Sequence, residues 1–358
     1  MYETHFDLRH RPFRTTPDTS HYYPATAHER ALNRILQGLN DQEGMILLTA
    51  EAGVGKTLVG NVILQRLGDK VASACLTNGH LRDRLALLQA ILYELGLPHE
   101  GRSEQEARLA LTDLLLKTYA AGRKTLLLVD EAHYLSGDLL EELRMLGNLE
   151  ASVGKALQVL LIAQPDIASV LELPQLVAVR QRLAIRARLD PLTVEESADF
   201  LRHQLRLAGG RPERLIADEA LVLLARSTQG VPRLLNQAAH QAFHLAFEAG
   251  ASQVDVEAAL EALEALGLNT ADELEPTESS FDANLAAVPN EDSGPVLSLT
   301  DTMADPVFSL AGQMEASTFD ADPGDVDNSE RMVSPKMRRT RRQLFHAISR
   351  KTTVRKLP

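Results

Sequence analysis

Short runs of apolar residues alternate with longer amphipathic stretches over the first 190 residues of the chain. The apolar runs have the length of strands and lack polar alternation, which predicts strands at 45–49, 71–76, 125–130, 157–163 and 184–189. Strands of this type are buried on both faces, and the helical stretches between them supply the cover. The pattern therefore predicts an α/β fold with a three-layer parallel sheet core.

Helical periodicity separates the strands and then continues alone. Within the core region it predicts helices at 26–39, 56–67, 81–95 and 104–121, and Thr26-Ala27-His28-Glu29 is expected to open the first of them as a capping box. After Pro191 only helical segments follow, near 194–207, 218–228, 232–249 and 253–266. We therefore expect a core over residues 1–191 and a helical lid over residues 192–268.

Composition narrows the class of protein. Hydrophobic residues make up 44% of the chain and charged residues 24%, which is typical of a globular protein. The single cysteine, Cys75, excludes an intramolecular disulfide and a multi-cysteine zinc site. The N-terminus has no signal-peptide pattern, and no apolar run approaches the roughly 18 residues that cross a bilayer. These features predict a cytoplasmic protein.

Charge is divided unevenly along the chain, whose net charge is −12. Residues 271–330 contain 15 acidic and no basic residues, so we expect an acidic disordered linker over 269–330. Residues 331–358 contain ten basic and no acidic residues. The favoured prediction for this basic tail is that it is solvated or folds back onto the acidic linker. Binding to an anionic membrane surface is the second alternative, and binding to nucleic acid is the least favoured.

A glycine-rich segment between the first predicted strand and the helix at 56–67 is the first candidate site. Gly53 and Gly55 would let the backbone turn its N–H groups around a β-phosphate, at the positive end of the following helix. Lys56 would reach the β- and γ-phosphates, and Thr57 would offer its hydroxyl to Mg²⁺. The usual motif begins with glycine, where this chain has Ala50. With the acidic residue discussed next, the predicted nucleotide-binding residues are Ala50, Glu51, Ala52, Gly53, Val54, Gly55, Lys56, Thr57 and Asp130.

Two carboxylates end the apolar run 126–129. Ligands bind at the carboxyl ends of strands in sheets of this kind. Asp130 would hold Mg²⁺ through its water shell, so Thr57 and Asp130 are the predicted metal ligands. Glu131 would polarise the attacking water as the catalytic base. An adjacent glutamate favours ATP hydrolysis over GTP signalling, and the predicted cofactors are ATP and Mg²⁺.

With these motifs the sequence resembles the AAA+ ATPases, and specifically the ExeA/GspA family associated with general secretion and type IV pilus-like systems. The resemblance covers about residues 1–265. Beside the phosphate loop it depends on the aromatic N-terminal segment with Arg11-Pro12-Phe13 and on three further elements: Asp130-Glu131-Ala132-His133, Ala163-Gln164-Pro165-Asp166 and Gly230-Val231-Pro232-Arg233-Leu234-Leu235-Asn236. It implies a P-loop NTPase core of AAA+ type with a C-terminal lid.

The resemblance also implies roles for further residues. Gln164 would occupy the sensor-1 position and orient water or the γ-phosphate. Arg182, before the fifth strand, would be an arginine finger acting in a neighbouring subunit, with Arg180 as the alternative. Arg233, at a helix start, would be the sensor-2 arginine. Together with Glu131 and Lys56, these are the predicted catalytic residues.

Other conspicuous side chains are expected to be structural. The aromatic residues of the N-terminal segment are predicted to pack onto the core, and part of that segment is expected to wall the adenine pocket; they are Tyr2, Phe6, Phe13, Tyr22 and Tyr23. Cys75 is expected to be a small core residue, and His133 a structural residue rather than a catalyst.

The predicted function is that of a Mg²⁺-dependent ATPase whose nucleotide lies between core and lid and between subunits. A nucleotide-dependent oligomer is therefore expected, and its expected partners are secretion or pilus assembly proteins. The expected location is the cytoplasm, with a peripheral position at the inner face of the membrane as the alternative. One alternative is a DNA-transaction ATPase of the replication-initiator or transposition-regulator type, since these share the core. Another is a nucleotide-switched scaffold without hydrolysis, which Glu131 and the sensor residues argue against.

Overall fold

The computed structural model describes residues 2–268 except 152–153, and the described residues fall within one compact unit. The predicted acidic linker (269–330) and basic tail (331–358) lie outside the described residues. Within the described part, no helix combines the length and the apolar character required to span a bilayer.

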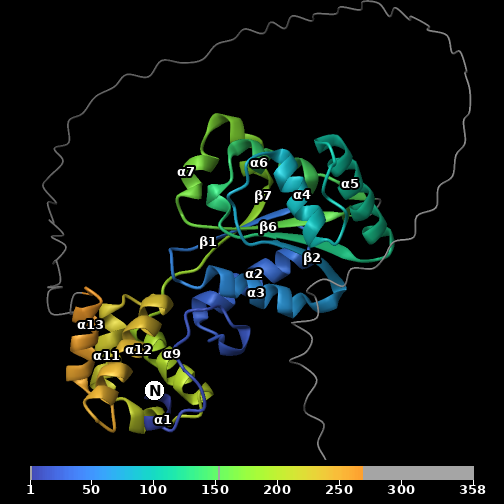
Figure 1. Cartoon of the computed structure of the whole chain (residues 1–358). Helices are drawn as coiled ribbons and strands as arrows, with labels where there is room; N and C mark the ends of the chain where they lie inside the picture. The colour runs from blue at the N-terminus through green and yellow to red at the C-terminus, as the bar shows by residue number, and fades with distance from the viewer. Residues whose placement is uncertain (1, 152–153, 269–358) are drawn as a thin grey trace, which may run out of the picture. The chain divides into compact units, whose positions relative to one another are not determined.

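Five parallel strands form the central sheet (Figure 1). In spatial order they are β2 (Val71–Leu76), β3 (Lys124–Val129), β6 (Leu157–Ala163), β1 (Met45–Thr49) and β7 (Leu183–Arg188). The apolar runs predicted all five strands with bounds correct to one residue. β1 is central, with Thr49 opposite Ala163 on one side and Arg188 on the other, so the loop after β1 emerges mid-sheet.

Helices cover both faces of the sheet, as a parallel sheet requires. Successive residues of β1 point to opposite faces: Ile46 and Leu48 pack into one apolar cluster, while Met45 and Leu47 pack into the other. The first face is covered by α2 (Thr26–Asn40) and α3 (Lys56–Leu67). The second is covered by α4 (Arg84–Glu94), α5 (Glu104–Ala120) and α6 (Gly137–Gly147), as Figure 1 shows. The α/β three-layer prediction is confirmed.

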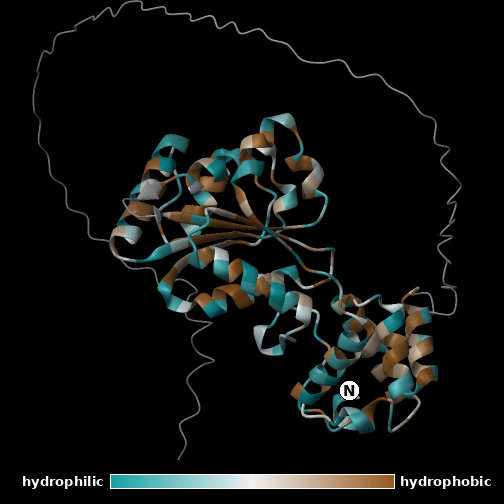
Figure 2. Ribbon diagram, turned by 180° about the vertical axis from the view of Figure 1, so that it is seen from behind, coloured by the Kyte–Doolittle hydropathy of each residue, from teal (hydrophilic) through white to brown (hydrophobic). Residues whose placement is uncertain are grey.

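Five helices follow the sheet and enclose an apolar cluster of their own. They are α9 (Val194–Leu207), α10 (Pro212–Leu215), α11 (Asp218–Ser227), α12 (Pro232–Glu248) and α13 (Val256–Ala265). The ribbons of these helices have one hydrophobic and one hydrophilic side, whereas the sheet strands are almost wholly hydrophobic (Figure 2). Periodicity predicted four of them and missed α10, which has a single turn.

The N-terminal segment up to Phe13 packs on these lid helices, whereas Tyr22 packs against the sheet face that α2 and α3 cover. The short helix α1 (Tyr2–His5) brings Tyr2 within 5.9 Å of the ring of Phe243, and Phe6 and Phe13 approach the same ring to 5.1 and 5.4 Å. Aromatic pairs at these separations add to the burial of the rings. The burial of these aromatics was predicted correctly, but for these three the surface that buries them is the lid.

Two local predictions are wrong. The capping box at Thr26 does not form, because α2 has Ala25 as its N-cap and Glu29 instead binds Arg66 of α3. The helix predicted from residue 81 begins at Arg84, where the Asp83 side chain accepts a hydrogen bond from the N–H of Ala86. The apolar pattern also missed short elements between β3 and β7: α6, α7 (Ile167–Leu171), α8 (Val177–Arg182), β4 (Glu150–Ala151) and β5 (Gly154–Lys155).

Candidate nucleotide site

The loop between β1 and α3 has the backbone shape of a phosphate cradle. Gly53 and Gly55 have φ values of 85° and 110°, in the region that glycine adopts without a steric penalty. Gly55 is the N-cap of α3, so the unpaired N–H groups at the start of that helix lie beside the loop. Such a helix start is a favourable site for an anion.

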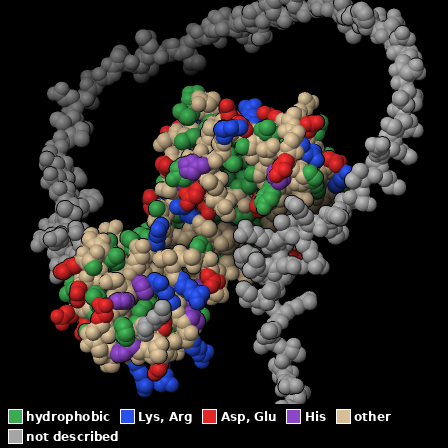
Figure 3. Space-filling model, in the orientation of Figure 1, with side chains coloured by type: hydrophobic (Ala, Val, Ile, Leu, Met, Phe, Trp, Pro, Cys, Tyr) green, Lys and Arg blue, Asp and Glu red, His purple; other side chains and the backbone are tan. Residues whose placement is uncertain are grey.

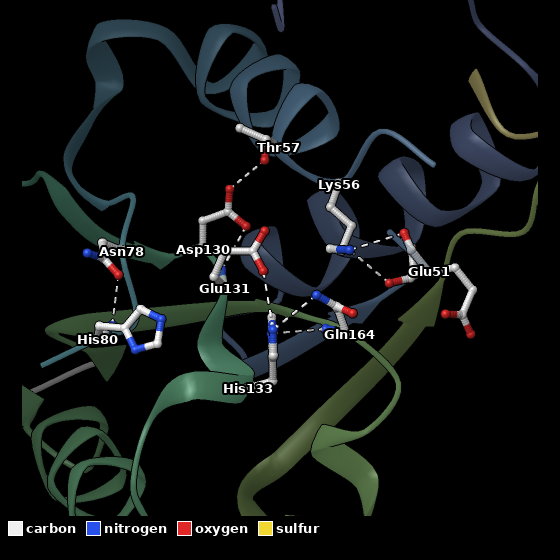
Figure 4. Close-up of polar contacts among 10 residues, drawn as sticks. Glu51, Lys56, Thr57, Asn78, His80, Asp130, Glu131, His133 and Gln164 are labelled. Atoms are coloured by element: carbon white, nitrogen blue, oxygen red, sulfur yellow. Dashed lines mark hydrogen bonds and ion pairs between the residues drawn. The ribbon is translucent and has the colours of Figure 1, made fainter. Parts of the chain in front are cut away.

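The Lys56 side chain lies along this loop. Its Nζ donates to the carbonyl oxygens of Ala50 at 2.9 Å and Glu51 at 3.1 Å, and the residue is 6% exposed. Burial lowers the pKa of the ammonium group, and the nearby carboxylates of Glu131 and Asp130 oppose that shift. The loop therefore holds a buried cation close to two acidic side chains (Figure 4).

Thr57 and Asp130 are in direct contact. Thr57 Oγ1 donates to Asp130 Oδ2 at 2.6 Å, which joins the first turn of α3 to the end of β3. The Asp130 backbone N–H donates to Leu76 O in β2, which fixes the carboxylate at the carboxyl edge of the sheet. A hydroxyl beside a carboxylate is an oxygen donor set that suits Mg²⁺ shared with phosphate oxygens. These two residues fit the predicted metal site.

Glu131 and Gln164 are brought together by a residue between them. Oε2 of Glu131 lies 3.4 Å from His133 Nε2, and Nε2 of Gln164 lies 3.1 Å from the same ring nitrogen (Figure 4). The Gln164 backbone N–H also donates to His133 Nδ1 at 3.3 Å. Sequence reasoning gave His133 no part in the site. The available signals were its position two residues after Glu131 and its place in Asp130-Glu131-Ala132-His133, one of the elements on which the family resemblance depends.

A cavity of about 530 Å³ lies against these groups. Its volume is within the range that holds a small-molecule cofactor. Core and lid both line it: Gly53, Lys56, Thr57, Glu131 and Gln164 come from the core, and Phe200, Gln204, Pro232, Arg233 and Asn236 come from the lid.

The lid also bonds to the phosphate loop directly. The backbone N–H of Arg233, at the start of α12, donates to Gly53 O at 3.2 Å. Its side chain lines the cavity, as the sensor-2 prediction requires. The start of α12 is therefore tied to the phosphate loop by a backbone hydrogen bond.

The N-terminal segment contributes a third wall. Arg14 to Asp18 and His21 line the cavity, whereas the five aromatic residues of the segment do not. Asn236 Nδ2 donates to Arg14 O at 2.9 Å, and Gln204 bonds both the ring and the carbonyl of His21. Two lid helices thus hold the segment against the cavity.

The two candidate finger arginines lie outside this cavity. Arg182 is exposed and lines a separate hollow of about 180 Å³ with Gln42 and Gly44, at the amino ends of β1 and β7. Arg180 lines another hollow with Arg186 and Arg188. Neither arginine lines the nucleotide cavity of its own chain. Arg182 lies at the opposite end of β1 from the phosphate loop, and the hollow beside Arg180, although it includes Thr49 at the carboxyl end of β1, is separate from that cavity. A role in hydrolysis would require a second molecule.

Residues 39–171 match the AAA domain family. General secretion pathway protein A of Aeromonas hydrophila is 36% identical over 255 residues, which cover 71% of this chain and 46% of that protein. The chain therefore spans less than half the length of this relative.

Solved structures share the fold. Cdc6p from Pyrobaculum aerophilum superposes with a TM-score of 0.57 at 18% identity, covering 69% of this chain and 71% of that chain. The Aeropyrum pernix ORC2 protein in ADPNP and ADP complexes gives a TM-score of 0.55 at 18% identity, covering 72% of this chain and 71% of that chain. At this identity the likeness concerns the fold alone.

Proposed function

We propose that this chain is an ATPase, which hydrolyses Mg²⁺-bound ATP to remodel protein partners during assembly of a protein secretion or type IV pilus-like machine. The match of residues 39–171 to the AAA domain family and the relation to General secretion pathway protein A support this proposal. The observation that carries the proposal is the single cavity onto which Lys56, Thr57 and Glu131 open from the core and Arg233 from the lid.

Binding follows from the loop. Its N–H groups and the start of α3 surround the β-phosphate, and the Lys56 ammonium neutralises charge on the β- and γ-phosphates. Thr57 and Asp130 would hold Mg²⁺, which would neutralise charge on the phosphate oxygens. The residues of the N-terminal segment that line the cavity enclose the base and sugar.

Hydrolysis requires a water positioned in line with the γ-phosphate. Glu131 accepts a hydrogen bond from that water and polarises it, and Gln164 orients the water or the γ-phosphate through its amide. Arg233 contacts the phosphates from the lid, so the position of α12 depends on which nucleotide is bound.

The proposed partners are a second copy of this chain and proteins of the assembling machine. Arg182, or Arg180, contacts the γ-phosphate of a neighbouring copy in a nucleotide-dependent oligomer, which acts on secretion or pilus assembly proteins. We expect the protein to act in the cytoplasm, either free or at a peripheral position on the inner face of the membrane. On the lower lobe of the face drawn in Figure 3, most basic side chains lie toward the middle and the bottom and most acidic ones at the left edge.

The first test is nucleotide binding by Lys56→Ala. Loss of the cation facing the phosphates is expected to abolish binding of Mg²⁺-ATP in an equilibrium titration, while the circular dichroism of the protein stays unchanged. EDTA is expected to stop phosphate release by the wild type. Wild-type affinity in Lys56→Ala would contradict the site.

A second test addresses the partner. Deletion of residues 331–358 is expected to leave basal phosphate release unchanged, and its effect on sedimentation with acidic liposomes decides whether the basic tail binds anionic lipid. Hydrolysis stimulated by DNA, and lost in the same deletion, would favour the DNA-transaction alternative.

A further inference from the structure

We propose that His133 is a positioning residue that holds the Glu131 carboxylate through its Nε2–H, in a tautomer fixed by the backbone of Gln164. The inference rests on the proposed function, in which Glu131 is the base for ATP hydrolysis. It adds a residue that touches neither nucleotide nor water and acts through Glu131.

The tautomer follows from one hydrogen bond. The Gln164 backbone N–H donates to His133 Nδ1 at 3.3 Å, and an amide N–H can only donate. Nδ1 therefore carries a lone pair, and the proton of the neutral ring resides on Nε2. The His133 side chain is 4% exposed, so water has little access to compete for either nitrogen.

The Nε2 proton faces two acceptors. Oε2 of Glu131 is 3.4 Å away, at the long end for such a bond, and catalytic hydrogen bonds of this kind tighten in the reacting complex. The Gln164 amide nitrogen is placed 3.1 Å away, but two donors cannot bond to each other. The amide orientation that pairs with Nε2–H is the one that turns its oxygen toward the ring.

This geometry gives His133 a coupling role. One proton serves the Glu131 carboxylate and the Gln164 amide, which belong to the ends of two adjacent strands, β3 and β6. When the Gln164 amide turns to a phosphate, the proton is left to Glu131 alone. Occupancy of the γ-phosphate position would in this way fix the orientation of the base.

The local fold holds the ring in place. Glu131 is the left-handed residue that opens the tight turn Ala132–Tyr134, and this turn folds His133 back toward the Glu131 carboxylate. The centroid of the Tyr134 ring lies 4.2 Å from that of the His133 ring, so the next residue of the turn packs against the imidazole.

Three variants test the role kinetically. His133→Ala is expected to lower kcat about 10-fold or more, the scale for removing a partner that orients an active group. The loss should fall on kcat more than on the Kd for ATP, because His133 bonds to Glu131 and Gln164 and to no residue of the phosphate loop. His133→Gln keeps an N–H donor near the Nε2 position and should recover most of the lost rate. His80→Ala is the matched control, since His80 stacks on Tyr134 at 4.0 Å and is expected to keep wild-type kcat.

Two kinetic outcomes would overturn the proposal. One is wild-type kcat in His133→Ala. The other is an equal loss in His133→Ala and His133→Gln, which would indicate that the ring serves packing alone.

A spectroscopic test needs no hydrolysis. Long-range ¹⁵N–¹H correlation spectra of the histidine rings report which nitrogen carries the proton, and the His133 signal is identified by its loss in His133→Gln. We expect the neutral ring to carry its proton on Nε2. An Nδ1–H ring or a doubly protonated ring would refute the assignment, whereas a wild-type protein that releases no phosphate would instead refute the proposed function.

Discussion

Glu131 has its backbone in the left-handed region, with φ of 52°, although it is not glycine. β3 ends at Val129, and the chain turns at once so that Asp130 and Glu131 both remain at the carboxyl edge of the sheet. A left-handed non-glycine residue costs about 1–2 kcal/mol. The loop after β2 packs closely against this turn, since a Cβ on Gly79 would collide with the Glu131 carbonyl. Strain that is held by its surroundings in this way is typical of functional residues.

Glu131→Gln separates hydrolysis from binding. The amide keeps the shape of the side chain and loses the charge that polarises water, so the Kd for Mg²⁺-ATP is expected to be unchanged while turnover falls about 10²-fold or more. Phosphate release and equilibrium titration measure the two quantities. Glu219→Gln, an exposed carboxylate on α11, is the control and should keep full turnover. Unchanged turnover in Glu131→Gln would remove Glu131 from the mechanism.

Sequence predicted the residues of this site that belong to one local motif. Lys56 and Thr57 follow a strand and begin a helix, and Asp130 and Glu131 end a strand, so their spacing alone carries the signal. His133 could not be assigned in this way. Its bonds to Gln164 depend on β3 lying beside β6, and no pattern within residues 130–133 contains that pairing.

At the scale of elements, one carboxylate serves two helices. Glu196 Oε1 accepts the N–H of Thr26 at 2.8 Å, at the start of α2, and its Oε2 accepts the N–H of Thr193 at 3.2 Å, at the start of α9. The local pattern predicted that Glu29, three residues away, would cap Thr26. The structure gives it Glu196 instead, 170 residues away on the lid. Local pattern cannot identify a cap that arrives from another part of the fold.

Glu196→Ala is expected to loosen the lid from the core. Loss of a helix cap costs about 1 kcal/mol, so the free energy of unfolding should fall by about that amount. Chemical denaturation measures it. Glu195→Ala, the neighbouring exposed glutamate with no bond to α2, should cause a smaller loss. Equal losses in the two variants would show that the contact with Thr26 contributes nothing.

The same contact predicts a dependence on pH. Burial alone would raise the pKa of Glu196, but the hydrogen bonds from Thr26 and Thr193 hold it below the usual range. A depressed pKa means that the folded state binds the proton less tightly than the unfolded state. The stabilisation is therefore present above the unfolded pKa of about 4.3 and is lost as pH falls through the folded value. The stability difference between wild type and Glu196→Ala should shrink below about pH 4 and stay constant from pH 6 to 8.

At the scale of the molecule, the sheet was predictable because its strands are continuous apolar runs buried on both faces. The helices between β3 and β7 were harder to predict from the sequence. There α7 and α8 have five and six residues, and α8 carries Arg180 and Arg182 in its last turn, so neither gives a clear helical period. The position of the N-terminal segment depends on Phe243, some 230 residues later, and only the folded chain brings them together.

The arginine finger can be tested across molecules, because Arg182 and the phosphate loop lie at opposite ends of β1 within one chain. Arg182→Ala alone is expected to slow phosphate release, since charge developing on the γ-phosphate loses a cation supplied by the neighbour. Mixing Arg182→Ala with Glu131→Gln should restore part of the rate. In that mixture an Arg182→Ala subunit keeps an intact Glu131 and meets an intact Arg182 on an adjacent Glu131→Gln subunit. Size-exclusion elution with ATP establishes that the two variants assemble together.

The same mixture with Arg180→Ala in place of Arg182→Ala distinguishes the two arginines, because only the residue that acts across the interface should give rescue. Co-assembled mixtures that show no rescue with either arginine would contradict a finger acting between subunits.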